Sequence, residues 1–190
     1  MKQPITGAIC VMLLITFGCS TTQTVSVTQP MERSANETAL AWFDRGNAYA
    51  QAGDYEDAIK DFTNAIDNDP RFADAYYSRG RALGRTGRHE QAIGDFTKTI
   101  ALNPGNPTVF ADRGVAYGSL GQHELAIKDF TQAIDLNPNF AGAYYNRAIG
   151  YFIEKKCVEA RKDLHQAQAL GHPKIQQKFL DDLNKDCPEN

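Results

Sequence analysis

The sequence holds few side chains of the kinds that carry out chemistry, and they are not arranged for it. The four histidines are His89, His123, His165 and His172. His89 and His123 recur 34 residues apart, but no Cys, Asp or Glu completes a metal set at ligand spacing. The sequence has no nucleophile elbow around a Ser, no phosphate-binding Gly loop and no zinc-peptidase motif. It therefore predicts a protein that is not an enzyme and has no metal or other cofactor.

One cysteine, Cys19, stands in a context that implies modification. Lys2 precedes an apolar run over residues 5–18 that ends at this cysteine. The run is shorter than the roughly 20 residues that span a bilayer, and its length is typical of a signal-peptide core. Residues 16–20 (Thr-Phe-Gly-Cys-Ser) resemble a bacterial lipoprotein processing site. The resemblance implies that residues 1–18 are a signal peptide and that Cys19 becomes the lipidated, palmitate-type first residue.

Two alternatives to lipidation are ordinary secretory cleavage and an uncleaved anchor. All three place residues 20–190 outside the cytoplasm. Ser20 stands where Asp would favour retention at the inner membrane. We therefore expect a lipid-anchored protein of the bacterial cell envelope, at the outer membrane and facing the periplasm.

A repeat of 34 residues predicts the helices of this chain. Its clearest markers are Gly46, Gly80, Gly114 and Ala148. Around each marker, a large aromatic, a very small residue and an aromatic or Leu recur at i, i+4 and i+7, which predicts one face of a helix. After a turn that contains Gly in the first three repeats, a second stripe of mostly Ala and Phe has the same spacing. A fixed period of this length is typical of repeat architectures.

The repeat resembles the tetratricopeptide repeat (TPR) over residues 39–172. The resemblance implies an all-α fold, a right-handed superhelical solenoid of four helix pairs with a concave inner surface. The predicted repeats are 39–72, 73–106, 107–140 and 141–173. Residues 19–38 form a tether and first helix cap, with Ser34 and Glu37 as a capping box. An amphipathic helix over 174–185 caps the other end, and the fourth repeat departs from the frame at Lys155 and Leu164.

Cys157 and Cys187 are positioned by this arrangement. Cys157 starts the second helix of the last repeat, and Cys187 follows the capping helix. If these helices pack antiparallel, the two cysteines lie side by side. In an oxidising compartment this predicts a disulfide that closes a loop of about 30 residues. The alternative is two free thiols.

A second regularity pairs arginines with aspartates. An Arg recurs at the seventh position of each repeat and an Asp at the twenty-third: Arg45, Arg79, Arg113 and Arg147; Asp61, Asp95, Asp129 and Asp163. A partly buried Arg needs a carboxylate partner. We infer a structural ladder of Arg–Asp pairs, within or between repeats.

The concave face is predicted by excluding the stripes that pack helix on helix. The remaining positions of the first helices are Phe43, Asn47 and Gln51; Asp74, Tyr77, Arg81 and Arg85; Thr108, Val115 and Ser119; and Tyr145, Ile149, Phe152 and Ile153. Aromatics and a few polar groups suit a peptide. Arg81 and Arg85, four residues apart, predict an acidic patch on the partner. The alternatives are two solvated arginines, and aromatics covered by the tether or by a second copy of the chain.

The predicted function is that of a membrane-tethered, non-enzymatic adaptor for a protein or peptide partner. The formal net charge is −3, without a basic footprint for nucleic acid. Some TPR proteins hold chaperone C-termini with a carboxylate clamp of Lys, Asn and Arg. Here only Asn47 stands at a clamp position, while Phe43, Ser78, Thr108 and Asp112 occupy the others. A secreted unlipidated binding module and a self-assembling homo-oligomer are the alternative functions.

Overall fold

The computed structural model describes residues 35–172 and 177–187. The expectations for the signal peptide, Cys19, Ser34 and the start of the capping helix lie outside these residues. The described residues form α-helices and no strands: α1 (Ala35–Ala52), α2 (Tyr55–Asn68), α3 (Ala73–Arg85), α4 (His89–Leu102), α5 (Pro107–Ser119), α6 (His123–Leu136), α7 (Ala141–Ile153), α8 (Cys157–Ala169) and α9 (Gln177–Asp186). None of these helices is both long enough and apolar enough to cross a membrane.

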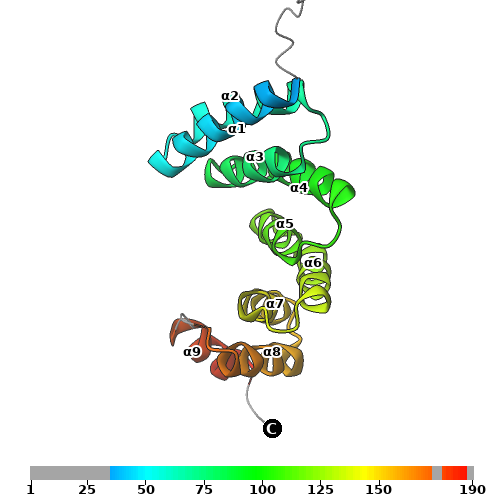
Figure 1. The fold of residues 1–190 in the computed structure, drawn as a ribbon. Coiled ribbons are helices and arrows are strands. Elements are labelled where there is room, and N and C mark those ends of the chain that lie inside the picture. The colour runs from blue at the N-terminus through cyan, green and yellow to red at the C-terminus, as the bar shows by residue number, and fades with distance from the viewer. Residues whose placement is uncertain (1–34, 173–176, 188–190) are drawn as a thin grey trace, which may run out of the picture. The chain divides into compact units, whose positions relative to one another are not determined.

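The first eight helices form four pairs, α1/α2, α3/α4, α5/α6 and α7/α8, and each pair stacks on the next (Figure 1). Short turns join the two helices of a pair, so that they run antiparallel. The predicted all-α stack of helix pairs is confirmed. One helix pair has too little apolar surface to stand alone, and the stacking of neighbours builds a continuous core.

A glycine at the eighth position of a repeat allows the two helices of a pair to touch. A Cβ atom added at Gly80 would lie 2.8 Å from Cε1 of Phe96, and the same clash recurs at the corresponding glycines of the first and third repeats. In the fourth repeat Ala148 stands at this position, and its partner is Leu164 instead of Phe. Ala148 and Leu164 compensate for each other, because the smaller leucine leaves room for the methyl group of the alanine.

The turn inside each pair uses a left-handed backbone conformation. Gly87 has φ +78°, and the corresponding glycines of the first and third repeats are similar. In the fourth repeat Lys155 adopts φ 57°, a conformation that costs an L-residue about 1–2 kcal/mol. The turn geometry is therefore kept even where the glycine is lost.

The four Arg–Asp pairs form within repeats and not between them. In each pair the Arg donates from two nitrogens to both oxygens of the Asp sixteen residues later. A third nitrogen of the guanidinium bonds to the preceding repeat: Arg79 to Thr63, Arg113 to Thr97 and Arg147 to Thr131, each at 3.0 Å. The Arg–Asp ladder, as we call these eight residues, therefore joins the helices of a pair and also joins neighbouring pairs.

A disulfide and side-chain hydrogen bonds connect the capping helix α9 to α8. Cys157 and Cys187 form a disulfide with a Cα–Cα distance of 5.5 Å, inside the range that a disulfide allows. Arg161 donates to the carbonyl oxygen of Cys187 and to the Asn184 side chain. Leu183 of α9 is 1% exposed. The helix thus closes the apolar end of the last repeat.

Candidate functional site

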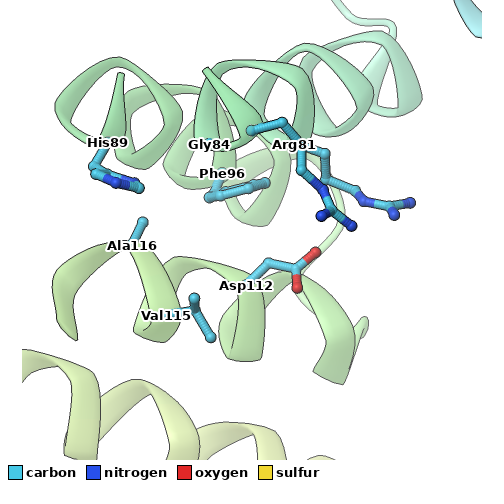
Figure 2. A pocket seen from close by; sticks show the side chains of 8 residues that line it. Arg81, Gly84, His89, Phe96, Asp112, Val115 and Ala116 are labelled. Atoms are coloured by element: carbon cyan, nitrogen blue, oxygen red, sulfur yellow. The ribbon is translucent and has the colours of Figure 1, made fainter. Parts of the chain in front are cut away.

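Two adjacent cavities open along α1, α3 and α5. The first cavity has a volume of about 250 Å³ and is lined by Asn47, Ala50, Gln51, Tyr55, Phe62, Ser78, Arg81, Ala82 and Arg85. The second cavity has a volume of about 310 Å³ and is lined by Arg81, Gly84, Arg85, His89, Phe96, Asp112, Val115 and Ala116 (Figure 2). Both sets come mostly from first helices, with one residue at the start and one in the middle of a second helix: Tyr55 and Phe62 of α2, and His89 and Phe96 of α4. The cavities therefore follow the face that the sequence predicted to be concave.

Arg81 and Arg85 belong to both cavities. They lie one helical turn apart on α3, and both are exposed. The guanidinium carbon of Arg81 lies 5.7 Å from the ring centroid of Tyr77, a position in which the aromatic face attracts the cation. The two positive charges therefore stand at the boundary between the cavities, where a ligand crossing from one to the other would meet them.

Asp112 is one of the lining residues that the predicted groove set did not include, although it stands at a clamp position. Its Oδ2 accepts a hydrogen bond of 2.8 Å from the Tyr77 hydroxyl, which joins α3 to α5. Figure 2 shows Arg81 and Asp112 reaching from facing helices toward the same opening. Burial raises the pKa of the Asp112 carboxyl, although the Tyr77 hydrogen bond and the charges of Arg81 and Arg85 act in the opposite direction.

A sequence signal for Asp112 existed. The sixth position of the repeat is polar in all four copies: Asp44, Ser78, Asp112 and Asn146. Such a position, between two packed faces of a helix, is a candidate lining position. Ser78 and Asp112 line the first and second cavities respectively.

The predicted groove residues fall into three groups. Asn47, Gln51, Arg81, Arg85 and Val115 line the two cavities. A second group is exposed but lines neither cavity: Asp74, Thr108, Ser119 and Ile153. The third group, of aromatic and apolar residues, packs between neighbouring repeats or under α9.

Phe43 and Tyr77, both at the fifth position, belong to this third group. The ring centroid of Phe43 lies 4.8 Å from that of Phe72 and 5.8 Å from that of Phe62. Tyr77 contacts the core around Phe96 and bonds to Asp112. Tyr77 therefore has packing contacts between repeats in addition to its predicted place on the groove face. The fifth position faces the next helix pair as well as the groove.

Tyr145, Ile149 and Phe152 are covered by the capping helix. Tyr145 is 8% exposed, stacks on His172 at 4.5 Å and meets the Phe179 ring edge-on at 5.9 Å. Phe152 meets the same ring at 5.5 Å, and Ile149 packs against this cluster. Tyr145 is therefore buried and not an open part of the groove, while Ile149 and Phe152 are partly exposed. α9 covers them as the first helix of a further repeat would.

The described residues contain no group of three or more His, Cys, Asp or Glu side chains that could hold a metal ion. What the two cavities offer is hydrogen-bond donors, two guanidinium groups, one carboxylate and an apolar wall. This combination can bind a peptide-like segment.

The chain is similar in structure to proteins built from the same repeat. It matches the crystal structure of MamA with a TM-score of 0.69 and 27% identity, over 70% of this chain and 78% of that chain. The first TPR of Spaghetti (RPAP3), bound to the HSP90 peptide SRMEEVD, matches with a TM-score of 0.62 and 28% identity. The match covers 63% of this chain and 95% of that chain.

The second TPR domain of human RPAP3, in complex with the HSP70 peptide SGPTIEEVD, matches with a TM-score of 0.60 and 30% identity, over 62% of this chain and 98% of that chain. No curated protein matches the chain in sequence. Models of the tetratricopeptide repeat match residues 37–107 and 107–140. With four helix pairs in this frame and these matches, the chain belongs to the tetratricopeptide repeat family.

Proposed function

We propose that the chain is a non-enzymatic adaptor that binds an acidic segment of a partner protein across the first and second cavities. The observation that carries this proposal is the pair Arg81 and Arg85, which both cavities share. Two exposed cations one turn apart repel each other in the free protein, and an acidic ligand relieves that repulsion. TPR domains generally mediate protein–protein interactions, and the RPAP3 domains bind peptides that end in Glu-Glu-Val-Asp.

The binding mode that we propose is not the carboxylate clamp. Phe43 packs on Phe62 and Phe72 instead of reaching toward a ligand, and Asp112 brings a negative charge to a clamp position. The acidic side chain would instead bind beside Arg81 and Arg85, where Asn47, Gln51 and Ser78 add neutral polar groups. A chaperone C-terminus is therefore not the partner that we propose.

We further propose that the adaptor is tethered to the outer membrane by a lipid on Cys19 and faces the periplasm. The support is the signal-like run over residues 5–18 and the processing-site resemblance around Cys19. A flexible tether of about 15 residues has a root-mean-square reach of roughly 20–25 Å. Such a tether would hold the groove near the membrane.

Binding is tested by cross-linking in the native membrane, identification of the attached protein and titration of that protein against variants. Arg81→Ala should weaken binding by about 1–2 kcal/mol, and more at low salt than at high salt because charge attraction is screened. Arg71→Ala is the matched control, since Arg71 is exposed, carries the same charge and lines neither cavity. Equal effects of the two substitutions would show that net charge and not the groove binds the partner.

The tether is tested separately by Cys19→Ser. We expect this variant to leave the membrane fraction and to lack the mass of the acyl groups. Membrane association that persists unchanged in the variant would refute lipid anchoring at this cysteine, while leaving the groove proposal intact.

A further inference from the structure

The two cavities differ in charge although they share two arginines. The first cavity contains Arg81 and Arg85 and no carboxylate; its other polar side chains are those of Asn47, Gln51, Tyr55 and Ser78. The second cavity contains the same arginines together with Asp112. The groove therefore changes from cationic to mixed charge along its length.

The carboxylate of Asp112 is held in place. The Tyr77 hydroxyl donates to its Oδ2 at 2.8 Å, and the Tyr77 ring packs 6.0 Å from the Phe96 ring, between centroids. This hydrogen bond to a packed ring restrains the Asp112 side chain. Asp112 therefore presents its carboxyl group in the second cavity together with Arg81 (Figure 2).

Apart from His89, the remaining wall of the second cavity is apolar. Phe96 and Ala116 are 3% and 4% exposed, so that they form its floor, while Val115 is 47% exposed beside them. Gly84 contributes no side chain, which leaves space above the floor. An apolar side chain of a ligand would bury surface here.

We propose that Asp112 is a specificity-determining residue, which directs an acidic side chain of the partner to the first cavity and an apolar side chain to the second. This inference rests on the proposed function. In the second cavity a ligand carboxylate would approach Asp112 in a partly desolvated space, and repulsion between the like charges would oppose the attraction of Arg81 and Arg85. In the first cavity the same carboxylate would meet cations and neutral polar groups alone. Asp112 thus sets both the register and the direction of the bound segment.

The test is selection of displayed random 12-residue peptides on the full chain. We expect the wild-type protein to select peptides in which an acidic and an apolar residue recur at a fixed spacing. Selection on Asp112→Asn should also yield peptides with a second acidic residue at the apolar position. Asn keeps an oxygen that can accept from Tyr77, so the substitution removes the charge and retains the contact. Asp74→Asn is the matched control, because Asp74 is an exposed carboxylate of α3 that lines neither cavity.

A second measurement compares the binding of two peptides. A selected peptide is made with Gln or with Glu at its apolar position. The Glu peptide should bind at least about tenfold more weakly than the Gln peptide, and the difference should disappear on Asp112→Asn and persist on Asp74→Asn.

The outcomes separate the two proposals. If Arg81→Ala weakens binding of the selected peptides while Glu and Gln peptides bind the wild-type protein equally, the role of Asp112 is refuted and the adaptor function stands. If the wild-type protein selects no peptide, or if Arg81→Ala leaves the affinity of the selected peptides unchanged, the proposed groove function fails and the inference fails with it.

Discussion

Replacement of Arg79 by Ala should destabilise the domain through the carboxylate that it leaves behind. Arg79 donates from Nε and from Nη2 to the two oxygens of Asp95 at 2.8 Å, and from Nη1 to Thr63 at 3.0 Å. The Asp95 side chain is 9% exposed and that of Arg79 is 20% exposed. The truncation removes the cation, a contact to the preceding repeat and the packing of the guanidinium on Tyr76.

The expected loss follows from the burial of the pair. Breaking a fully buried ion pair from one side costs about 3–5 kcal/mol, because the other charge stays buried without compensation. Water reaches a fifth of the Arg79 side chain, so we expect a smaller loss, about 2–4 kcal/mol. The same substitution at Arg45 should cost clearly less, since its side chain is 55% exposed and α1 has no preceding helix pair among the described residues.

The assay is urea unfolding followed by circular dichroism, with the urea slope required to stay unchanged between variants. The double variant Arg79→Ala/Asp95→Ala should be at least as stable as Arg79→Ala, because it removes the uncompensated carboxylate. A loss below about 1 kcal/mol, an equal loss for Arg45→Ala, or a further loss in the double variant would contradict this account of the ladder.

Further predictions follow from local geometry. Gly80→Ala should lower the stability by about 1–3 kcal/mol, because its Cβ would overlap the Phe96 ring. Gly94→Ala, whose Cβ would meet nothing within 4 Å, should stabilise α4 by about 0.5–1 kcal/mol. Thermal unfolding compares the two variants. Lys155→Gly should raise the melting temperature, since it relieves a left-handed conformation. Asp112→Asn should be more stable than wild type at neutral pH. Burial raises the pKa of this carboxyl, so its ionisation lowers the stability of the wild-type protein above that pKa, and the loss disappears as the pH falls through it. The stability difference between Asp112→Asn and wild type should therefore vanish in acid, and urea titrations at several pH values measure it. Reduction of the Cys157–Cys187 disulfide should lower stability by about 3–4 kcal/mol and increase hydrogen exchange in α9. Unchanged exchange in α9 would contradict the role of the disulfide in holding this helix against α8.

The sequence by itself determined the repeat and the helix pairs. The 34-residue period shows that one unit recurs, and the apolar stripes and glycine turns each act within that unit. Local signals of this kind act over a helical turn or one short loop, so that they can be recognised without knowledge of the fold. The neighbourhood of Cys157 and Cys187 followed from the same frame, because antiparallel neighbours bring the start of one helix beside the end of the other.

The tertiary structure decided which face of each first helix meets water. Tyr77 and Tyr145 share one repeat position, yet one lies beside an open cavity and the other is buried under α9. Periodicity identifies the face that packs inside a pair, but the adjoining face depends on the angle at which the next pair stacks. That angle is set jointly by many side-chain volumes across the interface. The same dependence placed Asp112 against Tyr77 and gave Arg79 its bond to Thr63, because each of these contacts joins two repeats.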